Sequence, residues 1–485
     1  MTGWHYKTAA ELVRAIRDQT ISSEALLDHF IARHDAHNAK INAIVATDFQ
    51  AARARARMAD TALAQGEIWG PLHGLPMTIK DALEVAELPA TGGAPIYADH
   101  RPAIHAPAVQ RIVDAGAVIF GKTNVPLLSA DLQTYNDIYG TTNNPWNLNC
   151  GPGGSSGGAA AALAAGLTAL ELGSDIGGSI RTPAHLCGVF GHKPSYGLVP
   201  THGHIPPPPG SFSEVDLSVV GPLARSAEDL ALLLGIVAGP NKMQARGWRL
   251  DLPAPRTHHP KNLRVAVWTE DPFCETDAET VSLINQTAEA LARAGARIDF
   301  AARPDFSLAE STEIYLMMLH AVIAAGMPGK IRANWEAVAK TLAPDDKSHR
   351  ALQARGGSLS YADWAVWHER RERLRAHWAA FFETCDVVLA PALIRPAFPH
   401  DHEPDWYKRS VLVNDKPRDY FDLLIWAGLA VVAYLPATVA PLGVTRGGLP
   451  VGVQIIGPYL EDYTSIEAAK MIELLTGGFR APPGY

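Results

Sequence analysis

The sequence predicts an α/β protein: one large α/β/α domain around a mixed, mostly buried β-sheet. Helical patterns alternate with short apolar strands along the whole chain, which is typical of sheets covered by helices. The 485 residues are 47% hydrophobic and 19% charged, enough apolar material for a large core. No repeat, low-complexity segment or clear linker divides the chain, so we expect residues 1–485 to form a single domain.

The elements follow in order from local signals. Thr8 and Glu11 form a capping box that predicts a first helix, and Ser22 precedes a second. The stretch GLPMTIKDAL contains an apolar strand ending in Lys80. Residues 108–124 predict a helix, a glycine turn and a strand, and residues 263–294 predict a strand and a helix. CDVVLAPAL and LPVGVQIIGP predict two more buried strands near the C-terminus.

Composition excludes several classes of function. The net charge of −8 and the absence of a dense basic run argue against a nucleic-acid or anionic-membrane partner. Residues 423–443 carry no charge, but Pro436 and Pro441 interrupt them, so we expect a buried helix and strand instead of a membrane span. The N-terminus lacks a hydrophobic signal core, and the four cysteines show no zinc spacing. We therefore expect a cytoplasmic protein with free thiols, no metal and no cofactor.

Three polar segments are interpreted as surface. HERRERLRAHW, with alternating charges, predicts a solvated helix face. The proline-rich loop HIPPPPG and residues 239–262 are interpreted as surface excursions, and residues 343–357 as a loop open to proteases.

The densest signal is GPGGSSGGAAAALAAGLTALELGSDIGGSIRTPAHLCG, in which two glycine-flanked serine turns are joined by an alanine-rich run. Glycine at this density indicates turns, close packing or ligand approach. Ser156 fits the G-x-S-x-G elbow of α/β-hydrolases, but a loop precedes it where that motif requires a strand. The run also lacks the Gly-Lys-Ser/Thr end of a phosphate-binding loop. Two serine turns joined by one helix suggest that both hydroxyls reach the same place.

The stretch resembles the amidase signature family of hydrolases. GGSSGG and GSDIGGSIRTPAHLCG are similar to the family's serine motifs, and GPLHGLPMTIKDAL is similar to its lysine strand. GTTNNPWN, VVGPLARSAEDLALLL, LPATVAPLG and GLPVGVQIIGP follow in the family's order. The resemblance covers almost the whole chain and implies a signature core at about 70–230 and a variable, substrate-side insert at about 300–430.

The resemblance also implies the site. Ser179 would be the nucleophile, Ser155 the bridging serine with a cis peptide bond, and Lys80 the base. The backbone N–H groups of Ile176, Gly177, Gly178 and Ser179 would form the oxyanion hole. No metal is expected to take part.

Lys80 must be neutral to act as a base, whereas a free lysine has a pKa of roughly 10.4. Burial in an apolar strand disfavours the ammonium form and lowers that pKa. Asp81 follows in sequence, but neighbours in a strand point to opposite faces, so it need not neutralise this effect.

Other polar residues near the motifs are expected to support the site. Ser156 would satisfy backbone groups, and Asp175 and Arg181 would hold the nucleophile loop by hydrogen bonds. His185 and His192 could suggest a Ser-His mechanism, but Lys80 already supplies a base, so we expect packed histidines. Cys187 is expected to be a core thiol.

Together these features predict an amidohydrolase that cleaves carboxylic amides through a Ser-cisSer-Lys triad and a serine acyl-enzyme. The substrate would be a small-molecule amide, carbamate (urethane), anilide or ester, as for a urethanase or aryl acylamidase, with no nucleic acid and no membrane, and a homodimer is left open. Aromatic residues of the insert, including Tyr361, Trp364 and Trp426, could line the pocket or pack helices. Two alternatives stay open: a glutamine-hydrolysing glutamyl-tRNA amidotransferase A-type subunit, whose RYG-like stretch is absent, and an esterase that uses Ser156.

Overall fold

The computed structural model describes residues 3–485 and is organised around one eleven-stranded mixed sheet. In spatial order the strands are β1 (Ile44–Thr47), β3 (Val118–Thr123), β2 (Pro76–Lys80), β6 (Glu171–Asp175), β8 (Val219–Ala224), β7 (Phe190–Lys193), β14 (Ala437–Val444), β15 (Pro450–Ile456), β11 (Val387–Pro391), β9 (Arg264–Val267) and β10 (Arg297–Asp299). β2 runs parallel to both β3 and β6, whereas β8, β7, β14 and β15 pair antiparallel. The predicted mixed sheet is confirmed.

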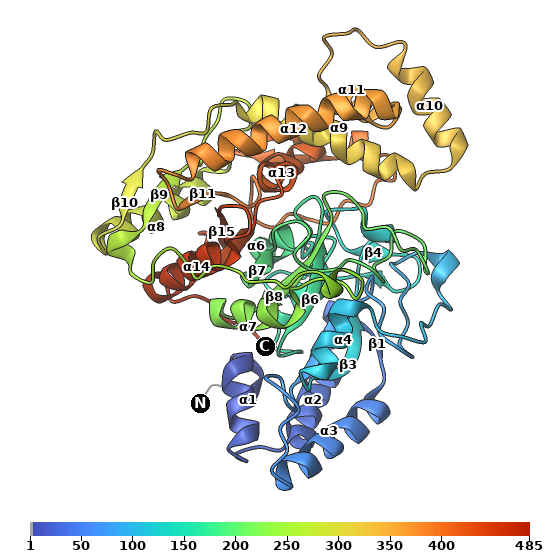
Figure 1. Cartoon of the computed structure of the whole chain (residues 1–485), viewed down its shortest axis with the longest axis vertical. Helices are drawn as coiled ribbons and strands as arrows, with labels where there is room; N and C mark the ends of the chain where they lie inside the picture. The colour runs from blue at the N-terminus through green and yellow to red at the C-terminus, as the bar shows by residue number, and fades with distance from the viewer. Residues whose placement is uncertain (1–2) are drawn as a thin grey trace.

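Helices cover the sheet in layers (Figure 1). Their bounds are α1 (Ala9–Arg17), α2 (Ser23–Ile41), α3 (Phe49–Ala64), α4 (Pro107–Asp114), α5 (Gly157–Ala164), α6 (Arg181–Cys187), α7 (Ala227–Val237), α8 (Ala278–Arg293), α9 (Leu308–Ala325), α10 (Gly329–Ala339), α11 (His349–Gly356), α12 (Tyr361–Phe381), α13 (Ile425–Val432) and α14 (Asp462–Thr476). α7, α8 and α14 form one layer, and α5 and α6 pack together in the other. Two small hairpins, β4 (Tyr135–Asn136) with β5 (Gly140–Thr141) and β12 (Ser410–Val413) with β13 (Lys416–Asp419), lie outside the sheet.

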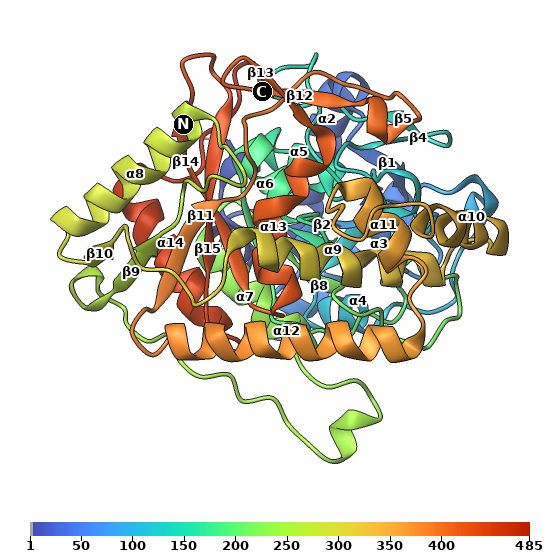
Figure 2. The same cartoon turned by 90° about the horizontal axis from the view of Figure 1, so that it is seen from above.

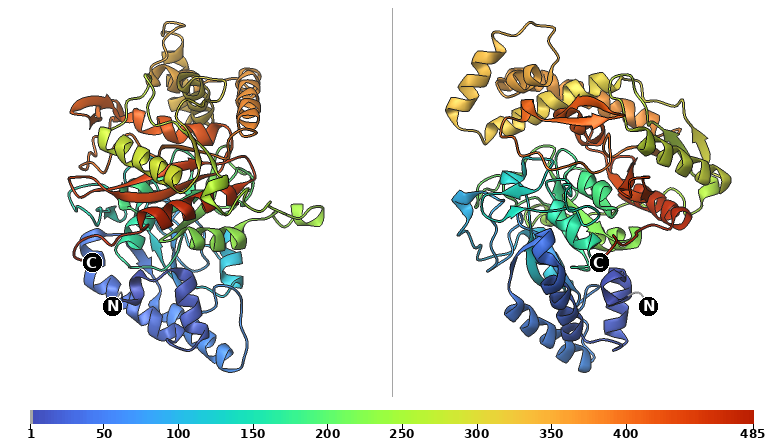
Figure 3. Two further views of the ribbon diagram at one scale, coloured as in Figure 1. Left: turned by 90° about the vertical axis from the view of Figure 1, so that its left-hand side faces the viewer. Right: turned by 180° about the vertical axis from the view of Figure 1, so that it is seen from behind.

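The helices between β10 and β11 form a cap at one end of the molecule. α9 to α12 lie together at the end opposite α1 to α3 (Figures 1 and 3). α9 packs against α11, α12 and α13, which joins the cap to the domain core. Among residues 3–485, α9 is the one helix long and apolar enough to cross a membrane, but 61% of it is buried inside the fold, as in a core helix.

Several local predictions are confirmed. Thr8 and Glu11 form both hydrogen bonds of the capping box, and Ser22 caps α2. β2 ends at Lys80, as the apolar pattern predicts. The uncharged stretch near the C-terminus forms α13 and β14, both buried at their cores.

Two surface predictions need correction, and a third agrees with the structure. Residues 349–356, expected as loop, form α11, whose Ala351 and Leu352 are buried. In α12, Arg371 and Trp378 are buried rather than solvated, because Arg371 donates to Asp216 and Trp378 packs in the core. Residues 239–262, predicted as a surface excursion, do extend from the body (Figures 2 and 3).

Candidate active site

Lys80 stands at the end of β2, between β3 and β6 and fully buried. Its Nζ lies within hydrogen-bond distance of two hydroxyl groups, 2.6 Å from Ser155 Oγ and 2.9 Å from Ser174 Oγ. No salt bridge to Lys80 is found among the residues that the structure describes. Its side chain therefore faces hydroxyl groups rather than a carboxylate.

Burial sets the protonation of this lysine. Removal from water lowers the pKa of Lys80 from 10.5 to about 7, although the carboxylates of Asp175, Glu171 and Asp81 act to raise it. Asp81 is held away, because its Oδ2 accepts hydrogen bonds from Thr91 N at 3.2 Å and Thr91 Oγ1 at 2.5 Å. Near neutral pH, a large fraction of Lys80 is thus an uncharged amine with a free lone pair.

The Ser155 turn is packed too tightly for side chains on its glycines. The Gly154–Ser155 peptide bond is cis. A Cβ on Gly154 would lie 2.5 Å from the carbonyl oxygen of Asp131, and one on Gly158 would lie 2.3 Å from the backbone nitrogen of Asn124. The glycine-rich run therefore lets the start of α5 approach neighbouring backbone closely.

Ser179 lies on the turn after β6 and is 5% exposed. The two serine turns are joined through backbone, since Ser156 N donates to the carbonyl oxygen of Ser179 at 3.0 Å. The Ser156 hydroxyl stays within the loop, donating to Ser174 O at 3.3 Å and accepting from Ser174 N at 3.4 Å. The structure thus brings both turns next to the end of β6.

Asp175 holds the Ser179 turn in place. Its carboxylate accepts hydrogen bonds from Gly178 N at 2.9 Å and Ile180 N at 3.0 Å, and it pairs with Arg181 at 2.8 Å. Burial alone would raise the pKa of Asp175, but Arg181 and the surrounding hydrogen bonds hold it at about 2. Arg181 also donates to the carbonyl oxygen of Ala427 at 2.9 Å, which ties the turn to α13.

One amide of the expected oxyanion hole already has an acceptor inside the protein. Gly178, at φ +99°, points its N–H at the Asp175 carboxylate, so this amide is already occupied. The amides of Ile176, Gly177 and Ser179 have no hydrogen-bond acceptor within residues 3–485. Three of the four expected amides are therefore unoccupied in the described part of the chain.

The Amidase family model matches residues 25–466. The chain belongs to the amidase family. It is a hydrolase that acts on C–N amide bonds, and the family assignment made from the sequence is confirmed.

Relatives span the full length of this amidase. It is 31% identical to the A-type subunit of the glutamyl-tRNA(Gln) amidotransferase of Acidobacterium capsulatum, covering 97% of this chain and 99% of that one. It is 35% identical to the corresponding amidotransferase subunit of Deinococcus deserti, covering 99% and 98%. Among solved structures, it is similar to a 6-aminohexanoate cyclic dimer hydrolase, with a TM-score of 0.78, 26% identity and 99% of both chains covered. It is also similar to a bacterial aryl acylamidase of the amidase signature family, with a TM-score of 0.79, 25% identity, and 97% of this chain and 96% of that one covered.

These relatives overturn the prediction about partners. We expected a small-molecule substrate and no nucleic acid, and we left a homodimer open. The curated relatives are named as subunits of an enzyme for glutamyl-tRNA(Gln), which implies both an assembly and a nucleic acid in their function. The net negative charge of the chain gives no sign of a nucleic-acid partner, because one subunit of a complex can work without itself binding the nucleic acid.

Sequence reasoning missed two residues of the hydrogen-bond network around Lys80, Ser174 and His204. Ser174 lies in β6, one residue before Asp175, and accepts from Lys80. His204, placed by the sequence in a surface excursion, is only 9% exposed, and its Nε2 lies 2.8 Å from Ser174 Oγ. Ser174 belongs to the GSDIGGS motif, which offered a signal, but the composition of the proline-rich loop around His204 gave none.

The cap also reaches the site through residues that were not predicted. Tyr315 of α9 donates from its hydroxyl to the carbonyl oxygen of Ile176 at 3.2 Å. A Cβ on Gly177 would lie 3.1 Å from that hydroxyl and 3.2 Å from Leu424 Cδ2. In contrast, Trp378 and Trp426 are buried in the core, and Tyr361 is exposed to solvent. Tyr315 and Leu424 thus stand next to the turn that carries Ser179.

The two histidines and the cysteine near the motifs are engaged elsewhere. His185 lies 2.9 Å from Gly452 O and 3.1 Å from Arg395 O. His192 contacts Thr438 Oγ1 at 2.9 Å and Asp462 Oδ1 at 3.0 Å. Burial raises the pKa of Cys187 far above its usual range, so this thiol stays protonated.

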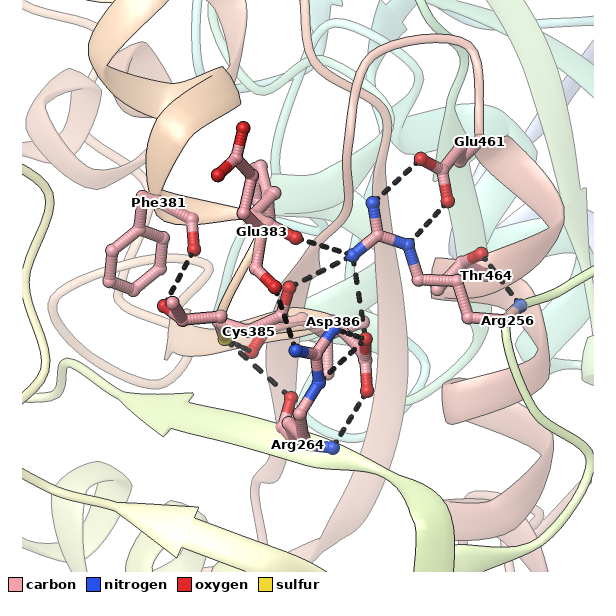
Figure 4. Close-up of polar contacts among 11 residues, drawn as sticks. Arg256, Arg264, Phe381, Glu383, Cys385, Asp386, Glu461 and Thr464 are labelled. Carbon is pink, nitrogen blue, oxygen red and sulfur yellow. Dashed lines mark hydrogen bonds and ion pairs between the residues drawn. The ribbon is translucent and has the colours of Figure 1, made fainter.

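Another polar cluster lies around Arg256, Arg264, Asp386 and Glu461 (Figure 4). It borders a cleft of about 610 Å³. Arg264 pairs with Asp386 at 2.6 Å, and Arg256 pairs with Glu461 at 2.6 Å. Because both guanidinium groups already have carboxylate partners, this cluster fastens residues near 256 to the start of β11 rather than offering a free cation.

Proposed function

We propose that this amidase cleaves amides through a covalent acyl-enzyme on Ser179, with Lys80 as base and Ser155 as proton relay. The contact between the buried amine of Lys80 and the Ser155 hydroxyl carries this proposal. An amine with a pKa of about 7 is a competent base at neutral pH. The free amides of Ile176, Gly177 and Ser179 would stabilise the oxyanion.

The proton follows a short path in this mechanism. Lys80 Nζ takes the proton of Ser155 Oγ, which takes the proton of Ser179 Oγ as that oxygen attacks the carbonyl carbon. The proton returns through Ser155 to the leaving nitrogen as the C–N bond breaks. Water then attacks the ester, giving up its proton to the same path, and releases the acid and Ser179.

As substrate we propose the side-chain amide of glutamine, with ammonia as the leaving group, in the role of an amidotransferase A-type subunit. The support is the identity of 31% and 35% to two such subunits over nearly the entire length of both chains. The absence of an RYG-like stretch means that other residues would have to bind the glutamine.

A second candidate is hydrolysis of a larger amide. Its support is the similarity to the 6-aminohexanoate cyclic dimer hydrolase and the aryl acylamidase, each over nearly the whole chain. The apolar Leu424 and the Tyr315 ring next to Gly177 would suit an apolar acyl or aryl group.

Covalent labelling tests the proposal first. Treatment with a fluorophosphonate should place one adduct on Ser179, identified by peptide mass spectrometry, and Ser179→Ala should lose it. Ser156→Ala is the matched control and should keep the label. An adduct on Ser156 or His192 with Ser179 unmodified would refute the assignment.

Substrate choice is tested by rates. Ammonia release from glutamine is compared with the cleavage of an anilide, a carbamate and a linear amide oligomer. Glutamine should give the largest kcat/KM. An anilide or oligomer cleaved faster than glutamine would reject the glutaminase proposal and favour the second candidate.

A further inference from the structure

Lys80 has two serine neighbours but only one lone pair in its neutral form. The lone pair must accept the Ser155 proton for the proposed reaction to begin. The Ser174 hydroxyl, at 2.9 Å from Nζ, is close enough to compete by donating its own hydrogen to that lone pair. Something must therefore decide which serine donates to the lysine and which accepts from it.

His204 decides the direction of the Ser174 hydroxyl. Its Nδ1 lies 2.9 Å from the carbonyl oxygen of Pro206. A carbonyl oxygen only accepts, so Nδ1 carries the hydrogen of this bond. Burial, together with the nearby Lys80, lowers the pKa of His204 to about 4, so the ring is neutral at working pH. Nε2 is then a bare acceptor at 2.8 Å from Ser174 Oγ, and the Ser174 hydroxyl donates to it.

We propose that His204 is a positioning residue that acts through Ser174 to aim the lone pair of Lys80 at Ser155. With its hydrogen committed to His204, Ser174 can only accept from Lys80. One N–H of the neutral amine then points at Ser174, and the lone pair is left for the Ser155 hydroxyl. This inference rests on the proposed role of Lys80 as the base.

The surroundings hold this arrangement firmly. Backbone pairing connects His204 with Leu83, three residues after the lysine, and His204 N donates to Thr201 O at 3.1 Å. Pro206 begins a run of four prolines, which restricts the backbone that presents its carbonyl.

The charged groups around Lys80 do not take over the part of Ser174 and His204. Asp175 and Glu171 on β6 and Asp81 after β2 act on Lys80 through space, and Lys80 is the charge that faces His204. The Glu171 carboxyl accepts from Thr78 Oγ1 at 2.5 Å instead. Ser155 and Ser174 are the hydrogen-bond partners of Lys80 within residues 3–485.

Two polar substitutions separate the functions of the imidazole. His204→Asn keeps an N–H near Nδ1 for Pro206 but has no atom in the place of Nε2. His204→Gln can place its amide oxygen near Nε2 and accept from Ser174. His202→Phe, two residues away on the same loop, is the control, because His202 stacks on Phe212 rather than on the relay. Thermal unfolding of each variant is measured beside the pH profile of amide kcat/KM.

His204→Asn should lower the plateau rate by about ten- to a hundredfold, the usual range for partners that orient a catalytic group. Its acidic limb should move to lower pH, since a Ser174 hydroxyl that donates to Lys80 stabilises the neutral amine. His204→Gln, which restores an acceptor for Ser174, should recover much of the rate lost in His204→Asn, and the control His202→Phe should stay near wild type. In a Ser174→Ala background, His204→Asn should have no further effect, because the hydroxyl it controls is gone.

The possible outcomes distinguish the proposed role of His204 from the proposed role of Lys80. A wild-type profile for His204→Asn, or an equal loss with and without Ser174, overturns the inference while leaving the triad intact. A similar loss in His204→Gln and His204→Asn also overturns it, because the acceptor would then be irrelevant. Retained amidase activity in Lys80→Met would instead overturn the proposed function.

Discussion

Lys80 and Lys122 lie on neighbouring parallel strands, and both are fully buried, but their surroundings differ in chemistry. Ile79 of β2 pairs with Lys122 of β3, so the two lysines are one position out of register. Burial lowers the pKa of Lys80 to about 7 and that of Lys122 to about 8. Lys80 contacts two serine hydroxyls, whereas Lys122 donates to three backbone carbonyls at 2.6 to 3.2 Å.

This difference teaches that burial alone does not make a catalytic lysine. A carbonyl oxygen can only accept, so the three carbonyls around Lys122 favour the ammonium form and hold the segment from Asp81 to Pro89. A hydroxyl can also give up a proton. Lys80 therefore has a partner that it can deprotonate, and Lys122 has none among the residues that the structure describes.

The largest expected effect is on amide turnover when Lys80 is lost. Lys80→Met keeps the apolar stem and removes the base, so amide kcat should fall by about a thousandfold or more. Ester turnover should fall less, because an alkoxide needs less help from an acid than an amine does. Lys80→Arg should not restore amide turnover, since a guanidinium stays charged. Steady-state rates on a matched amide and ester measure this.

Near-normal amide turnover in Lys80→Met would remove the contrast between the two lysines. His185 and His192 would then be the next bases to test, although the hydrogen bonds of both lead elsewhere.

The pH profile is a smaller but sharper test. The base form of Lys80 grows as pH rises through about 7, so kcat/KM should have an acidic limb there and fall about tenfold per pH unit below it. His204, whose pKa is lowered to about 4, cannot produce that limb. Measurement with a neutral amide substrate avoids titration of the substrate. A limb close to the ordinary lysine pKa, or a flat profile, would contradict the neutral-amine base.

The fold elements and the site motifs could be predicted from the sequence where they depend on residues close together in the chain. The apolar strand ending in Lys80, the capping box at Thr8 and the order of the glycine-serine turns all depend on neighbouring residues. The family and the mixed α/β sheet followed from them. The division into a signature core and a variable insert stays a prediction, as does the cytoplasmic location.

Contacts between distant segments could not be predicted in the same way. His204 joins Ser174 across 30 positions, and the proline-rich loop around it has the composition of an exposed turn. Arg371 looks solvated in an alternating-charge helix, but it is buried because Asp216, from a different loop, provides its partner. The resemblance assigns Gly178 to the oxyanion hole, but no sequence pattern shows that its N–H donates to Asp175.

The smallest expected effect on catalysis belongs to Lys122. Lys122→Met leaves the carbonyls of Asp81, Leu83 and Pro89 without their shared donor, and buried acceptors without partners are costly. The free energy of unfolding should fall by about 2–4 kcal/mol, seen as a lower urea midpoint, while amide kcat below that midpoint stays within about threefold of wild type, because no proton passes through Lys122.

Lys80→Met is the matched comparison: it should lose turnover and keep most of its stability, since burying a charge-free side chain there removes a desolvation cost. If Lys122→Met lost turnover as strongly as Lys80→Met while remaining folded, the carbonyl-bound lysine would have to share in the chemistry. The distinction between hydroxyl and carbonyl partners would then not explain which of the two buried lysines is the base.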